Sequence, residues 1–157
     1  MAGMAGTTAG HDHHTCVERA LDRAARVCAL NGSRLTAVRR RVLREVWRSH
    51  DAVKAYDILA RLGDARRKAK PPTVYRALQF LLAEGLVHRL ESLNAFIGCP
   101  APTRRHEGQF LICAGCGLVQ EIHAPGVAAA VQDAAQRAGF AVARQMVEVL
   151  GRCPRCA

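Results

Sequence analysis

The chain has 157 residues, which is enough for one ordinary domain or two small ones. Its apolar runs are too short to cross a membrane, and no basic segment followed by an apolar core indicates a secretory signal. The net charge of +10 is uneven: residues 1–90 hold 17 Lys and Arg against 8 Asp and Glu, whereas residues 91–157 hold 6 against 5. The first part is therefore expected to meet a polyanion, although a solvated basic surface would have the same composition.

Four helices and a β-hairpin are predicted for the first part of the chain. Residues 1–15 are mostly Gly, Ala, Thr and His and predict a disordered tail. Apolar residues at helical spacing predict helices over residues 16–30, 36–49, 54–62 and 73–84. Two β-like runs follow at residues 86–91 and 95–99, with a turn at Asn94. This order predicts a winged helix-turn-helix domain over residues 16–99.

A small α/β unit is predicted for the rest of the chain. Residues 100–107 are rich in Pro and charge and predict a linker. Strand-like runs at residues 109–113, 118–122 and 141–150 surround an Ala-rich helix at residues 126–138. Val127 and Val131 share one face of that helix. The predicted fold class is therefore α+β, with a winged helix-turn-helix domain followed by a small α/β domain over residues 108–157.

The helix expected over residues 73–84 has the features of a DNA-reading helix. Its buried face is expected to hold Val74, Ala77, Leu78, Leu81 and Leu82. Arg76 and Gln79 lie opposite, flanked by Tyr75; a guanidinium can pair with guanine and an amide with adenine in the major groove. Thr73, at the helix start, and Lys70, in the basic loop before it, are placed to contact phosphates. An ordinary amphipathic surface helix would show the same pattern.

Two CxxC pairs, Cys113/Cys116 and Cys153/Cys156, are separated by 36 residues. Each pair can hold one side of a zinc ion, and the two pairs together complete a tetrahedron of thiolates. Because four thiolates leave no coordination position open, such a site is structural rather than catalytic. A pair of redox-active dithiols is the alternative.

A second set of candidate ligands is more scattered along the chain. It comprises His88 and Cys99 on the two hairpin strands, His106 in the linker and Glu121 on a later strand. Two imidazoles, a thiolate and a carboxylate suit Zn²⁺ in ligand type and in charge. A metal ion bound by all four would tie the two units together, and the linker would act as a hinge. Whether His123 or the tail histidines His11, His13 and His14 bind metal stays open.

Several segments carry a resemblance to a known family. The stretches LTAVRRRVL, AYDILARL and AKPPTVYRALQFLLAEGLVHRLESLNAFIGC resemble the DNA-binding domain of the Fur superfamily of metalloregulators. The stretches FLICAGCGLVQEI and GRCPRC resemble its dimerisation domain. The similarity runs from about Leu35 to Cys156. The combination of KPPTVYRAL, VHRLES and the ICxxCG motif is most similar to the zinc uptake regulators, the Zur branch.

The resemblance implies a homodimer that represses zinc uptake genes by binding a palindromic, AT-rich operator in double-stranded DNA when metal is bound. It implies two zinc ions per chain. The structural ion would be held by Cys113, Cys116, Cys153 and Cys156, and the regulatory ion by His88, Cys99, His106 and Glu121. Tyr56 and Arg76 would contact bases. Residues 108–157 would form the dimerisation and zinc-binding domain.

Other functions are less well supported. The main alternative is a sensor of iron, manganese or peroxide from the same superfamily. A Cys99 thiolate, however, suits Zn²⁺ better than Mn²⁺ or labile Fe²⁺. A zinc deaminase would need an H-x-E segment, which the chain lacks. We therefore expect no enzymatic activity and no small-molecule substrate. Seven cysteines without a signal sequence indicate a reducing, cytoplasmic compartment and no membrane partner.

Overall fold

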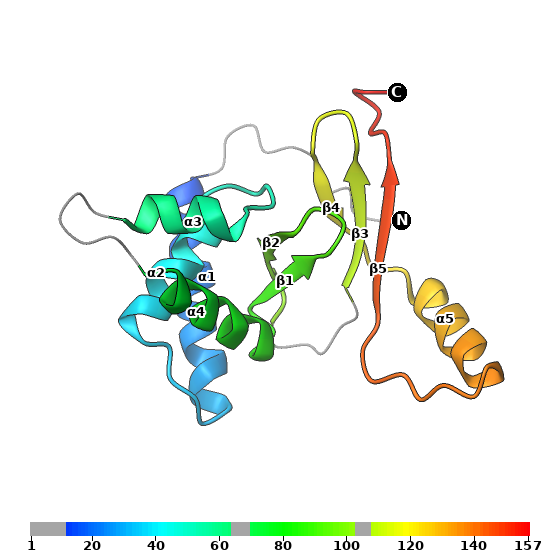
Figure 1. Ribbon diagram of the computed structural model, residues 1–157, viewed down its shortest axis with the longest axis horizontal. Helices are drawn as coiled ribbons and strands as arrows, with labels where there is room; N and C mark the ends of the chain where they lie inside the picture. Colours follow the sequence, from blue (N-terminus) through cyan, green and yellow to red (C-terminus); the bar gives the residue numbers. More distant parts are fainter. Residues whose placement is uncertain (1–11, 64–69, 103–107) are drawn as a thin grey trace.

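The structure is a computed structural model that describes residues 12–63, 70–102 and 108–157. Its elements are α1 (His13–Leu30), α2 (Ala37–Val46), α3 (Ala55–Leu62), α4 (Pro71–Ala83), β1 (Val87–Leu90), β2 (Ala95–Gly98), β3 (Gly108–Cys113), β4 (Val119–Glu121), α5 (Pro125–Arg137) and β5 (Met146–Gly151). Helices α1 to α4 lie on one side, strands β3 to β5 form a sheet on the other, and the hairpin β1–β2 lies between them (Figure 1). The α+β class is confirmed. None of the helices in these described ranges is long and apolar enough to cross a membrane.

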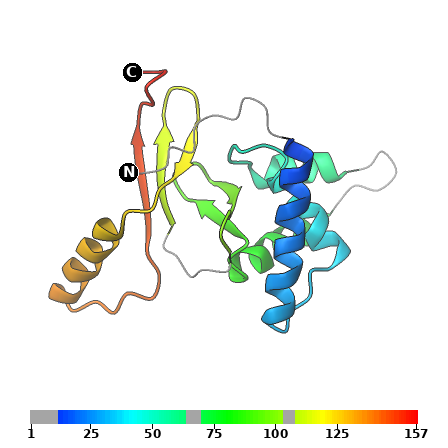
Figure 2. The same cartoon turned by 180° about the vertical axis from the view of Figure 1, so that it is seen from behind.

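Helices α1 to α4 close around one hydrophobic core, with α1 lying along the outside of the group (Figure 2). Leu21 of α1, Leu43 of α2, Ile58 of α3 and Leu78 of α4 are almost completely buried. They occupy the apolar positions that recur at helical spacing in the sequence. Burial of each such side chain stabilises the fold by about 1.5–3 kcal/mol, which is why the periodicity predicts the helices well.

Three helix boundaries differ by two or more residues from those predicted. Helix α1 begins at His13, inside the segment expected to be tail, because the Asp12 side chain accepts a hydrogen bond from the His14 backbone N–H and caps the helix. Helix α2 ends at Val46, three residues early. Helix α4 begins at Pro71, because proline suits the first turn of a helix, where its missing N–H has no partner.

The hairpin β1–β2 packs against a different neighbour on each face. Its strands pair antiparallel, with His88 opposite Ile97. Successive residues of a strand point to opposite faces. Val87 and Phe96 accordingly enter the helical core, whereas Leu90 and Ile97 pack into a second core against the three-stranded sheet. The hairpin therefore couples the helices to the sheet.

The three-stranded sheet has the order β4–β3–β5. Strand β4 pairs antiparallel and β5 parallel to the central β3. A parallel neighbour needs a crossover connection, which α5 supplies. The strand predicted over residues 141–150 is shorter than expected and begins at Met146. Phe110 and Ile112 of β3 and Val119 of β4 form the sheet's contribution to the second core.

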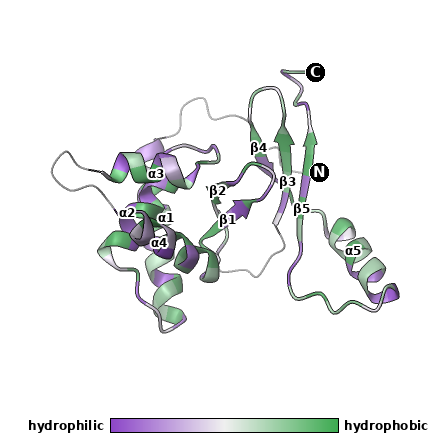
Figure 3. Cartoon of the chain, viewed as in Figure 1, coloured by the Kyte–Doolittle hydropathy of each residue, from purple (hydrophilic) through white to green (hydrophobic). Residues whose placement is uncertain are grey.

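Helix α5 carries the apolar face that the sequence predicts but does not bury it. It has no buried residue, and Val127 and Val131 remain 40% and 39% exposed. Figures 1 and 2 show the helix extending away from the sheet, and Figure 3 shows apolar residues along it. Within the described part of the chain, this face has no partner. The helical spacing correctly predicts the helix and its apolar face. It does not predict what packs against that face.

Candidate metal and DNA-binding sites

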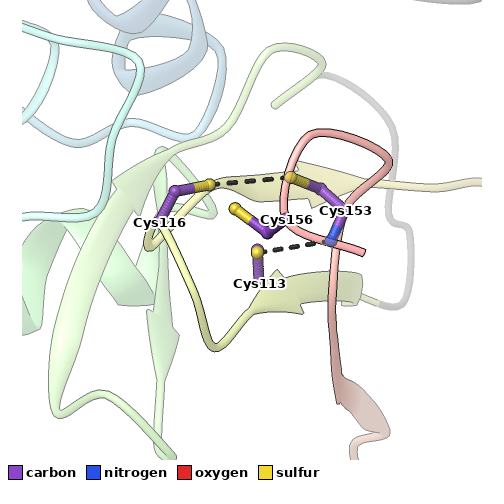
Figure 4. A group of neighbouring side chains, drawn as sticks. All are labelled: Cys113, Cys116, Cys153 and Cys156. Carbon is purple, nitrogen blue, oxygen red and sulfur yellow. Dashed lines mark hydrogen bonds between the residues drawn. The ribbon is translucent and has the colours of Figure 1, made fainter.

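The four cysteines of the two CxxC pairs meet at one end of the sheet. Their sulfur atoms all lie within 4.8 Å of one another, and the Sγ atoms of Cys116 and Cys153 are 3.7 Å apart. Figure 4 shows the four thiols converging from the β3–β4 turn and from the chain after β5. Four sulfur atoms on a tetrahedral zinc ion, each about 2.3 Å from the metal, lie about 3.8 Å apart. The spacing of the cluster is therefore close to that of a tetrahedral zinc site.

Strand pairing explains why cysteines so distant in the sequence come together. Cys113 ends β3 and lies opposite Gly151 of the parallel strand β5. Both CxxC segments therefore lie at the same end of the sheet. The turn approaches the second pair closely at Gly115, where a Cβ atom would lie 3.0 Å from the Cβ of Cys156. Glycine at this position allows the two cysteine loops to close on one another.

The electrostatics of the cluster also favour a bound cation. The backbone N–H of Cys153 donates a hydrogen bond of 3.3 Å to the Cys113 thiol. This donor, with further backbone N–H groups, holds the pKa of Cys113 down to about 6. The neighbouring thiols of Cys116 and Cys153 instead raise the pKa of Cys156 to about 12. Four thiolates ionise together only when a cation neutralises them. All seven cysteines of the chain are free of disulfide bonds.

Two of the four predicted regulatory ligands, His88 and Glu121, lie close together between the hairpin and the sheet, and a third, Cys99, lies nearby. Nε2 of His88, on β1, lies 3.7 Å from a carboxylate oxygen of Glu121, on β4. Cys99 follows β2 and is buried, with its backbone N–H bonded to the Leu86 carbonyl at 3.0 Å. His106 lies outside the described residues. The ligand atoms of His88, Cys99 and Glu121 do not all lie within 4.8 Å of one another, in contrast to the four cysteines.

The environment of Cys99 fits a metal ligand better than a free thiolate. Burial raises the pKa of this thiol to about 11, opposed by a hydrogen bond from the Ala101 backbone and reinforced by the negative charge of Glu121. A buried thiol near a carboxylate ionises only beside a cation. Sulfur, nitrogen and carboxylate oxygen are the donor types that zinc takes in proteins.

The other described histidines lie outside these two groups. His123 is exposed. His13 and His50 contact each other through their rings, whose centroids are 5.0 Å apart. In the described ranges, the four cysteines are the one group of three or more potential ligands within 4.8 Å. His11 lies outside those ranges, and metal binding by the tail histidines stays an open question.

The predicted DNA-reading helix presents its polar face to solvent. Val74, Ala77, Leu78 and Leu81 of α4 are buried, as the helical spacing predicts, whereas Leu82, expected on the same face, is half-buried. The residues predicted to contact DNA are all exposed: Tyr56, Lys70, Thr73, Tyr75, Arg76 and Gln79. Tyr56 and Tyr75 are 73% and 53% exposed, which is unusual for large aromatic side chains and suits a binding surface. Of the basic loop before α4, residues 64–69 lie outside the described ranges.

The structure adds Arg39 of α2 to this surface. Its guanidinium carbon lies 3.5 Å from the centroid of the Phe80 ring on α4, a cation–π contact that contributes about 0.5–1 kcal/mol at an exposed site. Arg39 also lines a small hollow with Thr36, Thr73 and Arg76, between the starts of α2 and α4. The sequence did not single out Arg39, because the contact joins two helices and the only local signal was a run of arginines.

The fold has four helices followed by a hairpin, with an exposed reading helix, and it carries a Cys₄ cluster. These features define a metal-binding protein of the winged-helix DNA-binding class. The ferric uptake regulator family matches residues 30–150. The chain belongs to this family.

The similar proteins include zinc uptake regulators. The zinc uptake regulation protein of Escherichia coli strain K12 is 41% identical over 145 residues, which cover 90% of this chain and 84% of that protein. The zinc uptake regulation protein of Mycobacterium tuberculosis strain H37Rv is 31% identical over 86 residues, covering 54% of this chain and 64% of that protein.

Solved structures show the same relationship. A zinc uptake regulator in complex with zinc and DNA has a TM-score of 0.83 at 39% identity, covering 88% of this chain and 93% of that one. The holo form of XcZur has a TM-score of 0.78 at 40% identity, covering 86% and 94%. The apo form of XcZur has a TM-score of 0.52 at 38% identity, covering 89% and 97%. At nearly equal identity, this chain is arranged more like the holo form.

Proposed function

We propose that this protein is a zinc-responsive transcriptional repressor, a homodimer that binds a palindromic, AT-rich operator and controls zinc uptake genes. The observation that carries this function is the meeting of His88 and Glu121, 3.7 Å apart, across the contact between the hairpin and the sheet. A site formed by both parts of the molecule can link metal occupancy to their relative position. The zinc uptake regulators similar to this chain, one of them bound to zinc and DNA, support the same function.

DNA reading is assigned to α4. Arg76 and Gln79 lie on its exposed face and are of the residue types that make paired hydrogen bonds to guanine and adenine. Thr73 and Lys70, at the start of the helix, are placed to contact phosphates. Tyr56 extends from the neighbouring helix α3 and is placed to contact bases at the edge of the same surface.

Metal control is assigned to His88, Cys99, Glu121 and His106. When bound, Zn²⁺ supplies a positive charge that these four side chains share. His88 and Cys99 move with the hairpin and α4, whereas Glu121 moves with the sheet. Their joint ligation therefore restricts the angle between the reading helix and the sheet. In a homodimer, that angle sets the spacing of the two reading helices, which must match half-sites about one helical turn apart or a multiple of it.

The four cysteines hold a second zinc ion per chain in this proposal. Cys113 ends β3, Cys116 lies in the turn after it, and the other two cysteines follow β5. Their ligation stabilises the sheet but does not reach the hairpin. The two sites thus have separate tasks, one in folding and one in switching.

The dimer interface is assigned to the outer face of the sheet and to α5. Leu111 and Val149 lie opposite each other in the β3–β5 register, on the face away from Phe110, and are 40% and 49% exposed. The apolar residues of α5 and Phe140 add to this uncovered surface. An exposed apolar patch on a protein of this size indicates a partner, and a second copy would cover it isologously. A DNA partner and seven free cysteines support a cytoplasmic location.

A sensor of iron, manganese or peroxide is the second candidate, and the thiol ligand Cys99 argues against it. The deciding experiment measures binding of the full-length dimer to an AT-rich palindromic duplex after chelation, and after addition of Zn²⁺, Mn²⁺ or Fe²⁺. We expect tight binding with Zn²⁺ and only salt-sensitive, sequence-independent binding without it. Equal operator affinity with and without Zn²⁺ would contradict the proposed function.

A further inference from the structure

Three side chains form a row across the sheet and face the hairpin. In the strand register, Phe110 of β3 lies opposite Glu121 of β4 on one side and opposite Glu148 of β5 on the other. Side chains at the same register position point to the same face of a sheet. Phe110 is buried against the hairpin, and its ring centroid lies 5.3 Å from that of His88. Both glutamates therefore flank the point at which the sheet meets the hairpin.

The two glutamates contact the hairpin in different places. Glu121 lies near His88 in the middle of β1. Glu148 instead binds the turn between β1 and β2: its Oε1 accepts a hydrogen bond of 2.7 Å from the Glu91 backbone N–H. Its Oε2 accepts one of 3.0 Å from the Ser92 backbone N–H and another from the Ser92 hydroxyl. One carboxylate thus receives three hydrogen bonds from one turn, 56 and 57 residues away in the chain.

The charge state of Glu148 agrees with this geometry. Partial burial raises the pKa of its carboxyl group, but the hydrogen bonds from Ser92 and Glu91 outweigh burial and leave the pKa below its usual value. At neutral pH the group is an anion that accepts hydrogen bonds and donates none. Such charge-assisted hydrogen bonds are stronger than neutral ones.

We propose that Glu148 is a positioning residue for the metal switch, a latch that holds the β1–β2 turn against β5 and thereby aligns His88 with Glu121. The inference rests on the proposed function, in which these two residues ligate zinc. Beside the apolar packing of Leu90 and Ile97, a polar contact at His88 alone would leave the hairpin able to rotate about Phe110. A second contact on the other side of Phe110 removes that rotation.

The latch acts on zinc affinity through the population of the aligned arrangement. When only a fraction of molecules is aligned, the apparent dissociation constant for zinc rises in inverse proportion to that fraction. Loss of hydrogen bonds to a charged group at a half-buried site is expected to reduce that fraction, and to weaken regulatory zinc binding roughly 3- to 30-fold. Zinc at the four cysteines is unaffected, because Glu148 touches none of them.

The test compares three variants of the full-length dimer. Glu148→Gln keeps the size of the side chain but removes its charge and one acceptor oxygen. Ser92→Ala removes one of the three hydrogen bonds and leaves both backbone donors. Glu91→Gln is the matched control, because it removes a carboxylate from the same turn while preserving the backbone N–H that Glu148 binds. The Glu91 carboxylate itself pairs with Arg89 at 3.2 Å.

Two readouts are needed. Amide hydrogen exchange at Glu91 and Ser92, in protein holding only the cysteine-bound zinc, reports the latch directly and needs no regulatory zinc or DNA. We expect exchange at both amides to be about 10-fold faster in Glu148→Gln, to rise less in Ser92→Ala and to be unchanged in Glu91→Gln. A Zn²⁺ titration of the regulatory site should show the same order of effects among the three variants. At saturating Zn²⁺, operator affinity should return close to that of the unaltered protein.

Each outcome separates the latch from the proposed function. Unchanged exchange at Glu91 and Ser92 in Glu148→Gln would overturn the latch, and so would faster exchange with an unchanged zinc midpoint. If the unaltered protein binds no zinc at the regulatory site, the proposed function fails. The exchange rates alone then decide whether Glu148 holds the turn. If Glu148→Gln does not fold, Ser92→Ala still tests the order of effects.

Discussion

His88 of β1 and Glu121 of β4 place an imidazole nitrogen and a carboxylate oxygen 3.7 Å apart, although the two residues belong to different sheets. The pair lies where the hairpin, buried on both faces, meets the three-stranded sheet. Because the hairpin also packs on the reading-helix side of the molecule, any ligand that joins the pair acts on the position of α4. The following predictions test this arrangement and the cysteine cluster separately.

Cys113→Ser should remove the structural zinc. Serine replaces one of four thiolates, and the apparent binding energy of structural zinc, about 10–16 kcal/mol in small domains, stabilises the surrounding fold. We expect loss of zinc together with unfolding of the sheet or loss of the dimer, measured by metal analysis, circular dichroism and sizing. Cys16→Ser, at a half-buried thiol on α1, is the control and should keep both zinc ions. A Cys113→Ser protein with full zinc content and an intact dimer would contradict the assignment.

Cys99→Ser, or His88→Ala, should separate folding from switching. Each variant keeps all four cysteines of the structural site, so we expect a folded dimer with one zinc ion per chain. Operator binding should no longer respond to Zn²⁺, as measured by titration of the duplex. Cys28→Ala is the matched control, since Cys28 is also a buried thiol but lies in the helical core. Zinc-dependent operator binding by Cys99→Ser would contradict the proposal that regulatory zinc sets the angle between the reading helix and the sheet.

Arg76→Ala should reduce operator affinity by about 1–3 kcal/mol and relax the preference for one base pair. Lys70→Ala should weaken binding to all sequences alike and lower the salt dependence by about one counterion, because it removes a phosphate contact. Both changes lie on exposed positions of α4 or its cap and should leave stability nearly unchanged. Binding constants at several salt concentrations distinguish the two. If Arg76→Ala binds its operator normally, α4 is not the reading helix.

Val149→Asp should disrupt the homodimer. The substitution places a charge on the outer face of the sheet, where Val149 lies opposite Leu111, and burial of an unpaired carboxylate is strongly unfavourable. We expect a monomer in sizing experiments and loss of operator binding even with saturating Zn²⁺. Leu30→Asp is the control, because Leu30 is 83% exposed on α1, outside the proposed interface. A dimeric Val149→Asp protein would locate the interface elsewhere.

Local features of the chain were predictable because they depend on residues near one another in the sequence. The buried face of α4 follows from its helical spacing, and the β1–β2 turn follows from Asn94, which has the positive φ of 46° that asparagine tolerates. The two CxxC pairs predict a closed thiolate cluster, since the chemistry of four sulfur ligands is the same wherever they lie. The structure brings these four together.

Other features depend on pairing between distant strands, which no local pattern encodes. The row formed by Glu121, Phe110 and Glu148 exists only because β5 joins β3 in parallel, after a crossover through α5. A shift of one residue in that register would turn Glu148 to the outer face and Val149 towards the hairpin. In the sequence, Glu148 is one carboxylate among apolar residues of a strand. Only the tertiary structure decides that it binds the turn at Ser92, because strand register is set by packing over the whole sheet and not by the residues beside it.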